Sequence, residues 1–216
     1  MRWNMLFFDL DGTLTDSGPG VMGAVRYAFR AMGKTAPDEA ALRGFIGPTL
    51  IDSFSQYFPL PQAEEAVWKY REYYAKTGWL ENGPYPGIGS CLGALRAAGA
   101  RLFVATSKME DSARQVLDHF GLAPYFEAVC GAAADDPVHG AKEVVLRAAL
   151  QQAGCADPRR AVMIGDRKFD ILGGRAAGLE TVGVLYGYGS REELTAAGTT
   201  EIVETVQDLQ TLLLQE

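Results

Sequence analysis

Two pairs of aspartates follow apolar runs in this sequence and are the residues best suited to do chemistry. Asp9 and Asp11 come directly after the run MLFF, and Asp166 and Asp170 follow the run AVMIG. Carboxylates this close together raise each other's pKa and cost free energy unless a cation lies between them. Mg²⁺ suits such a site because it takes few protein ligands and completes its shell with water and phosphate. The aspartates therefore predict a magnesium site.

A magnesium site of this kind favours attack on phosphorus. Asp9 and Asp166 can hold the cation, which leaves one oxygen of Asp9 free to form an aspartyl-phosphate. Asp11 is well placed to give a proton to the leaving oxygen, and later to take one from the water that hydrolyses the intermediate. We therefore predict Asp9 and Asp11 as the catalytic residues.

The transferring phosphoryl group also needs hydrogen-bond donors and a positive charge. Thr106 and Ser107 follow the apolar run RLFVA, and we predict that they bind phosphoryl oxygens. Lys142 opens the helical pattern AKEVVLRAAL and is the first candidate for the cationic side chain. Lys108 is the second candidate, and it is also a candidate substrate contact.

The segments that carry these residues have the pattern of an α/β protein. Apolar runs without alternation predict strands that are buried on both faces, and helical patterns that end at glycine separate them. This alternation predicts a Rossmann-like, doubly wound parallel sheet, in which ligands bind beyond the carboxyl ends of the strands. We expect strands at residues 5–9, 101–106, 128–130, 161–165, 180–184 and 201–203, and helices at 88–98, 109–120, 141–153, 167–177 and 206–214.

The alternation of strands and helices is interrupted once, after the first strand. Residues 17–83 contain only helical stretches, over 20–32, 38–45, 49–57 and 62–77. We predict an α/β core of residues 1–16 and 84–216, with an inserted all-helical cap of residues 17–83 over the site.

Within this predicted cap, two residues are candidate substrate contacts, Arg43 and Gly47. A run of aromatic residues in the last helical stretch is interpreted as packing of the cap core rather than as a stack for a ligand. This run consists of Trp68, Tyr70, Tyr73 and Tyr74.

Composition excludes several classes of partner. The formal net charge of −7 argues against binding to a nucleic acid polymer and against a basic contact with a membrane surface. The 3 cysteines form no CxxC pair, and no apolar run approaches the roughly 18 residues of a membrane span. We expect a cytoplasmic protein that acts on a small metabolite as a monomer or a homodimer.

Four segments of the chain resemble the motifs of the haloacid dehalogenase (HAD) superfamily, in its phosphatase branch. These are DLDGTLTD, FVATS, Lys142 and IGDRKFD, in the order of the superfamily, with the helical insertion at the position of its C1 cap. The resemblance implies that Asp9 is the nucleophile and Asp11 the general acid and base, with the Asp11 backbone carbonyl as a metal ligand. It also implies phosphate binding by Thr106 and Lys142, and a magnesium site that includes Asp166 and Asp170.

Two longer segments resemble one subgroup more closely. GDRKFDILGGRAAGLETVGVLYGYGSREEL and FIGPTLIDSF are similar to phosphoglycolate phosphatases and bacterial 5′-nucleotidase-like proteins. The resemblance implies a Mg²⁺-dependent phosphomonoesterase that acts on a small phosphorylated metabolite, with phosphoglycolate and nucleoside 5′-monophosphates as candidates.

Two alternatives share part of this chemistry. A phosphosugar mutase uses the same pair of aspartates, although RGFIGPTL does not have the signature of a sugar-mutase cap. A receiver-like signalling domain also forms an aspartyl-phosphate on a parallel sheet, but such domains are much shorter and lack a helical insertion.

Overall fold

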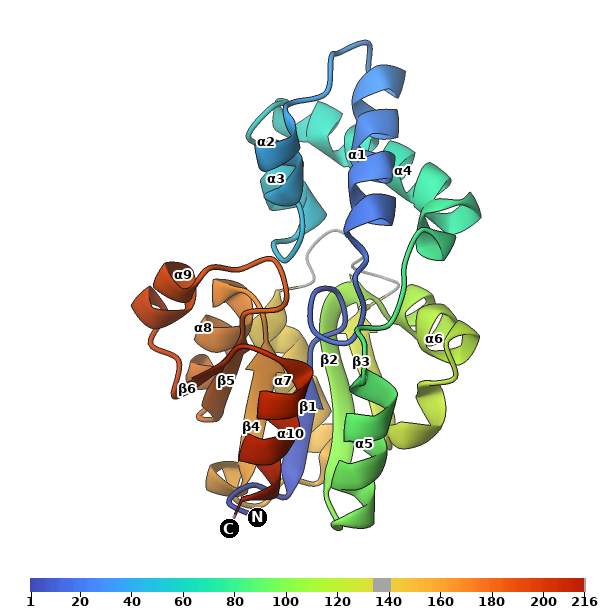
Figure 1. The fold of residues 1–216 in the computed structure, drawn as a ribbon. Coiled ribbons are helices and arrows are strands. Elements are labelled where there is room, and N and C mark those ends of the chain that lie inside the picture. Colours follow the sequence, from blue (N-terminus) through green and yellow to red (C-terminus); the bar gives the residue numbers. More distant parts are fainter. Residues whose placement is uncertain (134–140, 216) are drawn as a thin grey trace.

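One parallel sheet forms the centre of the molecule, and the computed structural model describes residues 1–133 and 141–215. Helices cover both faces of this sheet (Figure 1), which confirms the predicted α/β fold with a helical insertion between the first two strands. The 6 strands run in the order β3-β2-β1-β4-β5-β6. They are β1 (Met5–Phe8), β2 (Arg101–Met109), β3 (Ala128–Ala132), β4 (Ala161–Gly165), β5 (Glu180–Val184) and β6 (Glu201–Val203).

The central strands are apolar throughout because both of their faces are buried. In β1, Leu6 and Phe8 enter the cluster under α5 (Ile88–Ala97), α6 (Glu110–His119) and α10 (Val206–Leu214). Phe7 points to the opposite face and stacks on Phe103 of β2, with 4.9 Å between the ring centroids. That opposite face is covered by α7 (Lys142–Ala153) and α8 (Lys168–Ala176). Such burial rigidly fixes the strand ends that carry the polar residues.

Two elements differ from the sequence-based expectation. Strand β2 continues three residues beyond its expected end, to Met109, with a shift of register against β3 between Ala105 and Met109. The polar segment TSK has no apolar pattern that would predict this extension. The short helix α9 (Arg191–Ala196) was not expected, because Leu194 is its one buried residue.

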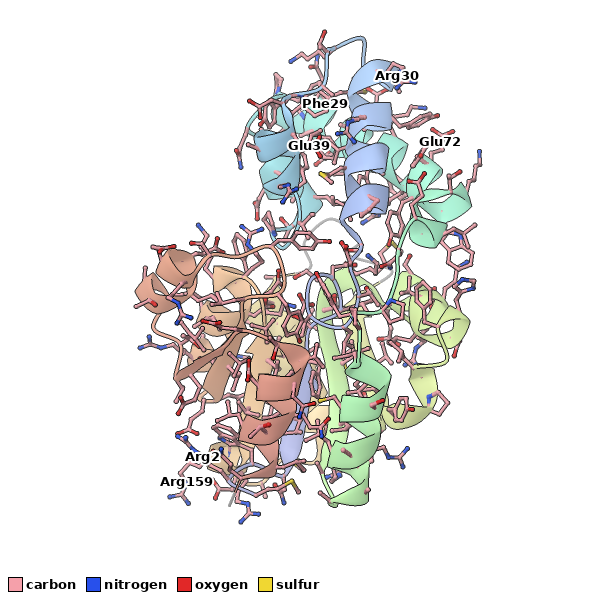
Figure 2. All side chains as sticks on the ribbon, viewed as in Figure 1. Arg2, Phe29, Arg30, Glu39, Glu72 and Arg159 are labelled. Atoms are coloured by element: carbon pink, nitrogen blue, oxygen red, sulfur yellow. The ribbon has the colours of Figure 1, made fainter. Side chains whose placement is uncertain are left out.

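Four of the helices between β1 and β2 stand beyond the carboxyl ends of the strands (Figure 1). They pack around their own aromatic cluster, in which Phe29 is buried while Arg30, Glu39 and Glu72 lie on the outside (Figure 2). The limits of a separate cap at residues 17 and 83 stay a prediction. These helices are α1 (Gly18–Ala31), α2 (Glu39–Arg43), α3 (Leu50–Phe54) and α4 (Leu60–Lys76), and short 3₁₀ turns lie at Gly78–Leu80, Ala123–Tyr125 and Pro158–Arg160.

The two chain crossings between this helical insertion and the sheet lie side by side. The N–H of Asp16 donates to the carbonyl of Gly83 at 2.7 Å, and Thr15 forms an isolated bridge with Pro84. The insertion is therefore joined to the rest of the chain through a narrow paired connection.

Within the described residues, no helix has both the length and the apolar character that crossing a membrane requires.

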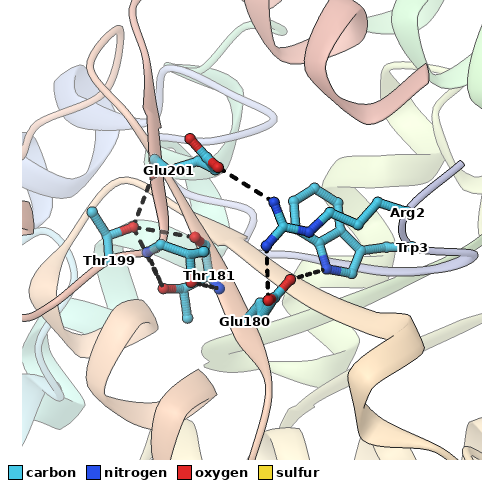
Figure 3. A network of polar contacts seen from close by, with 7 residues as sticks. Arg2, Trp3, Glu180, Thr181, Thr199 and Glu201 are labelled. Carbon is cyan, nitrogen blue, oxygen red and sulfur yellow. Dashed lines mark hydrogen bonds and ion pairs between the residues drawn. The ribbon is translucent and has the colours of Figure 1, made fainter. Parts of the chain in front are cut away.

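A network of polar contacts holds the chain start against the far end of the sheet (Figure 3). Glu180 of β5 accepts from the Arg2 guanidinium at 2.8 Å and from the Trp3 indole N–H at 2.5 Å. Arg2 also donates to Glu201 of β6 at 3.3 Å, and its guanidinium lies 4.5 Å from the Trp3 ring centroid. These contacts fasten β5 and the short edge strand β6 to the segment that leads into β1.

Candidate active site

Three buried carboxylates meet at the carboxyl edge of the sheet. Asp9 follows β1, Asp166 follows the neighbouring β4, and Asp170 lies in the first turn of α8. One oxygen of each lies within 4.8 Å of the others, and the residues are only 4%, 0% and 1% exposed. Because β1 and β4 are parallel neighbours, their ends bring together aspartates that are 157 residues apart in the sequence (166 − 9). This acidic cluster was predicted from the sequence.

Lys142, at the start of α7, lies inside the acidic cluster. Its Nζ lies 2.7 Å from Oδ1 of Asp9 and 2.8 Å from Oδ1 of Asp170, and it donates to the carbonyl of Ala105 at 3.0 Å. The buried carboxylates raise the pKa of Lys142 above its usual value, against the opposing effect of burial. One ammonium group leaves the charge of three carboxylates only partly balanced.

Burial and the remaining negative charge raise the pKa values of two of these aspartates. Burial and the nearby Asp170 raise the pKa of Asp9 to about 6, although Lys142 opposes this shift. Burial, Asp170 and Asp9 also raise the pKa of Asp166 well above its usual value. In addition, Oδ1 of Asp166 is buried and has no hydrogen-bond partner among the described residues. The residues therefore fit a divalent cation with oxygen ligands, as Mg²⁺ requires.

Backbone N–H groups donate hydrogen bonds to the Oδ2 atoms of two of these carboxylates. The N–H of Tyr188 donates to Oδ2 of Asp166 at 2.8 Å, and the N–H of Arg167 donates to Oδ2 of Asp170 at 3.1 Å. A side chain at Gly12 or Gly187 would overlap Asp166, so these two glycines let the loops close over it. Sequence reasoning did not identify the loop around Tyr188, although the glycines of YGYG were a signal of close backbone approach.

Asp11 lies apart from the acidic cluster and is paired with Lys108. The Nζ of Lys108 lies 2.6 Å from Oδ2 of Asp11 and 4.5 Å from the centroid of the Tyr74 ring. Asp11, Tyr70 and Tyr74 raise the pKa of Lys108 above its usual value even though burial opposes this. The side chain of Asp11 therefore does not join the three carboxylates, and metal binding through its backbone carbonyl stays a prediction.

A cavity of about 350 Å³ opens between the strand ends and the helical insertion, and it contains most of the predicted site residues. Asp9, Asp11, Thr106, Ser107 and Lys108 line it from the sheet. The buried hydroxyl of Thr106 accepts from the N–H of Lys108 at 3.2 Å. The residues predicted to attack phosphorus, to move a proton and to bind phosphoryl oxygens therefore line one cavity.

The two residues predicted from the insertion are placed differently. Gly47 lines the cavity with a φ of +112°, and a Cβ at this position would lie 2.7 Å from Cγ of Arg167. Arg43, by contrast, is exposed at the end of α2 and is not among the residues that line the cavity. Sequence reasoning missed the contribution of α4, which lines the cavity through Trp68, Tyr70, Arg71, Tyr74 and Ala75.

The family model of haloacid dehalogenase-like hydrolases matches residues 6–184. The chain belongs to this family. Among its relatives is a 5′-nucleotidase of Pseudomonas aeruginosa, 39% identical over 215 residues that cover 99% of this chain and 96% of the relative. The tyrosine-protein kinase PtkA of Mycobacterium tuberculosis is 39% identical over 211 residues, 97% of this chain and 72% of PtkA. A phosphoglycolate phosphatase of Caulobacter vibrioides is 33% identical over 210 residues, which cover 94% and 87% of the two chains.

Solved structures of haloacid dehalogenase-like hydrolases have the same fold. A predicted phosphatase from Clostridium acetobutylicum superposes with a TM-score of 0.94 at 39% identity, and the match covers 99% of both chains. The predicted membership of the HAD superfamily and the predicted enzyme class, a phosphatase-type hydrolase, are therefore confirmed. The buried acidic cluster is consistent with a metal site of the kind typical of haloacid dehalogenase-like hydrolases.

Proposed function

We propose that this chain is a Mg²⁺-dependent phosphomonoesterase that hydrolyses a small phosphorylated metabolite through an aspartyl-phosphate on Asp9. The observation that carries the proposal is the position of Asp9. Its carboxylate contacts Lys142, belongs to the acidic cluster and lines the cavity that also holds Asp11 and Thr106. When bound by Asp9, Asp166 and Asp170, Mg²⁺ would offset negative charge on the carboxylates and on the phosphoryl oxygens.

Asp9 and Asp11 each take part in both chemical steps. A carboxylate oxygen of Asp9 forms a bond to phosphorus while the bond from phosphorus to the leaving oxygen breaks, and Asp11 gives that oxygen a proton. Asp11 then takes a proton from a water molecule, whose oxygen attacks phosphorus and releases Asp9. Lys142 and Thr106, with Ser107 beside them, bind the phosphoryl oxygens and stabilise the charge that is redistributed in each transition state.

The names of the relatives supply the candidate substrates. Phosphoglycolate and nucleoside 5′-monophosphates are both small phosphomonoesters, in agreement with the expectation from the sequence. The name of PtkA adds phosphoryl transfer to tyrosine as an activity to be tested.

The experiment is a phosphate-release assay on phosphoglycolate, AMP, a sugar phosphate and p-nitrophenyl phosphate, with Mg²⁺ and with chelator. We expect release that requires Mg²⁺ and is lost in Asp9→Asn. The matched control is Asp157→Asn, which removes an exposed carboxylate at the start of a 3₁₀ turn and should leave activity unchanged. If Asp9→Asn retains wild-type release, or if chelator has no effect, the proposed mechanism is wrong.

Two further arms of this assay separate the alternatives. A phosphosugar mutase would convert its sugar phosphate into an isomer and release little inorganic phosphate. A kinase of the kind that the name PtkA describes would transfer the terminal phosphate of labelled ATP to tyrosine in a protein. Hydrolysis of small phosphomonoesters without either reaction supports the proposal.

A further inference from the structure

Trp68 is placed unlike the other aromatic residues of α4. Tyr70 and Tyr74 are buried and stack on each other with 5.6 Å between their ring centroids. Trp68 is 57% exposed, yet it lines the same cavity as Asp9 and Asp11. The interpretation of this residue as part of the packed core is therefore wrong, because the turn of the helix carries Trp68 away from the buried face. A large exposed aromatic ring in a cavity wall offers a surface for a ligand.

The cavity is suited to an apolar, flat group on its cap side. Its polar end holds Asp9, Asp11 and Thr106, whereas the walls beyond are mostly carbon. Its volume of about 350 Å³ lies within the usual range for small-molecule sites, and a two-carbon leaving group would fill little of it. The apolar wall consists of Val21, Phe45, Ile46, Leu50, Trp68, Tyr70, Tyr74 and Met109.

The cations of the cavity are arranged around its aromatic rings. The guanidinium of Arg71 lies 5.3 Å from the centroid of the Trp68 ring, within the distance of a cation–π contact. Lys108 is held by Asp11 at 2.6 Å, so its charge is already balanced inside the protein. A carboxylate placed beside Lys108 would compete with Asp11 for that cation, whereas an uncharged ring needs no such partner.

We propose that the cap side of the cavity binds an aromatic ring in the leaving group of the substrate, with Trp68 as the surface on which the ring stacks. This inference rests on the proposed phosphomonoesterase function and adds a substrate class to it. The class is a phosphomonoester of a nucleoside or of a phenol, rather than of a short aliphatic acid. Ser112 also lines the cavity, and its hydroxyl group can donate to the sugar of a nucleoside.

The first test compares kcat/KM for AMP, phosphotyrosine and phosphoglycolate in the presence of Mg²⁺. We expect the wild-type protein to prefer at least one aromatic substrate over phosphoglycolate by about 10-fold or more. The ranking of AMP against phosphotyrosine then shows whether the leaving group is a nucleoside or a phenol. In Trp68→Ala, kcat/KM for the preferred aromatic substrate should fall by roughly 10-fold, mainly through KM, because a stack on one aromatic side chain contributes on this order.

Two further variants separate stacking from a general loss of structure. Trp68→Phe keeps an aromatic surface and should recover most of the loss. Leu60→Ala is the matched control, because Leu60 lies on the same helix, is 58% exposed and does not line the cavity. Phosphoglycolate hydrolysis should stay within about 2-fold of wild type in all three variants. If phosphoglycolate is the preferred substrate, or if Trp68→Ala lowers all rates equally, the inference is overturned.

A binding measurement separates this inference from the proposed function. In Asp9→Asn, which we expect to be inactive, AMP and phosphotyrosine should quench tryptophan fluorescence, and the additional change Trp68→Phe should remove the quenching. Quenching without any turnover by the wild-type protein would contradict the proposed hydrolysis and keep the aromatic site. Turnover without quenching that depends on Trp68 would contradict the aromatic site and keep the hydrolysis.

Discussion

Tyr188 connects the acidic cluster to the first residues of the helical insertion. Its backbone N–H donates to Oδ2 of Asp166 at 2.8 Å. At the other end of the same residue, the hydroxyl accepts from the N–H of Gly18 at 2.6 Å and donates to the carboxylate of Asp16. Gly18 is the first residue of α1. One residue thus contacts both a predicted metal ligand and the connection between the insertion and the sheet.

Removal of this hydroxyl should affect the insertion and spare the metal site. In Tyr188→Phe the backbone contact to Asp166 remains, whereas Gly18 and Asp16 lose their common partner. We expect a loss of about 1–3 kcal/mol in the free energy of unfolding, because two hydrogen bonds are lost and one of them is to a charged group, and a several-fold loss of kcat/KM for phosphate release. The Mg²⁺ concentration for half-maximal activity should not change. A large shift in that Mg²⁺ concentration would show that the hydroxyl acts on the metal site instead.

A methyl group at Gly187, by contrast, should affect the predicted metal site. In Gly187→Ala the added Cβ would overlap Asp166 and the carbonyl of Gly12. We expect a loss of about 1–3 kcal/mol in unfolding free energy, as for other overpacked sites, together with a requirement for at least 10-fold more Mg²⁺. The matched control is Gly89→Ala on α5, where a Cβ meets nothing within 4 Å and should be neutral or stabilising. Normal Mg²⁺ dependence in Gly187→Ala would contradict the close packing of this loop.

Sequence and topology were sufficient to predict the acidic cluster. Asp9 and Asp166 each follow an uninterrupted apolar run, and such runs are typical of strands whose carboxyl ends meet at one edge. The order of the strands then brings the two aspartates together. The same reasoning placed Thr106 at that edge, because it follows the apolar part of β2.

Contacts that depend on side-chain direction were not predictable in this way. Trp68 and Tyr70 are two positions apart on one helix, but only Tyr70 is buried, and a single aromatic run does not show which direction faces the core. The pairing of Lys108 with Asp11 requires β2 to extend past Thr106, and the polar residues Ser107 and Lys108 do not predict this extension. The role of Tyr188 depends on a loop whose path only the tertiary structure defines.

Lys142→Met should show how strongly the acidic cluster depends on its lysine. This change removes the buried ammonium group that contacts Asp9 at 2.7 Å and Asp170 at 2.8 Å. Removal of one partner from a buried ion pair costs about 3–5 kcal/mol, so we expect a loss of that size in unfolding free energy in chelator. Mg²⁺ should restore part of the stability but not phosphate release, because Lys142 is a proposed phosphate ligand. Urea unfolding in chelator and in Mg²⁺ measures both quantities.

The control for this change is Arg147→Met on the same helix, where the arginine contacts Glu143 at 2.9 Å on the exposed surface. An exposed pair of this kind contributes about 0–1 kcal/mol. If Lys142→Met and Arg147→Met destabilise the protein equally, the buried contacts of Lys142 are not the source of its effect.

The pH dependence of stability should reveal the raised pKa of Asp9. Burial and Asp170 raise this pKa from 3.8 in the ordinary side chain to about 6 in the folded protein. The folded chain therefore binds the proton more tightly than the unfolded chain does. In chelator, the stability from this group is present below about pH 4 and is lost as the pH rises through 6, by up to about 1.4 kcal/mol per pH unit. Asp9→Asn should show a smaller loss over the same range.

Mg²⁺ should reverse this trend, because it binds the deprotonated carboxylates of Asp9, Asp166 and Asp170. The gain in unfolding free energy on adding Mg²⁺ should therefore increase from pH 5 to pH 8 in the wild-type protein. Asp157→Asn, which changes a carboxylate outside the acidic cluster, should behave as the wild type does. Urea unfolding across this range, in chelator and in saturating Mg²⁺, measures the gain. A gain that does not vary with pH would show that Mg²⁺ does not compete with protons for the acidic cluster.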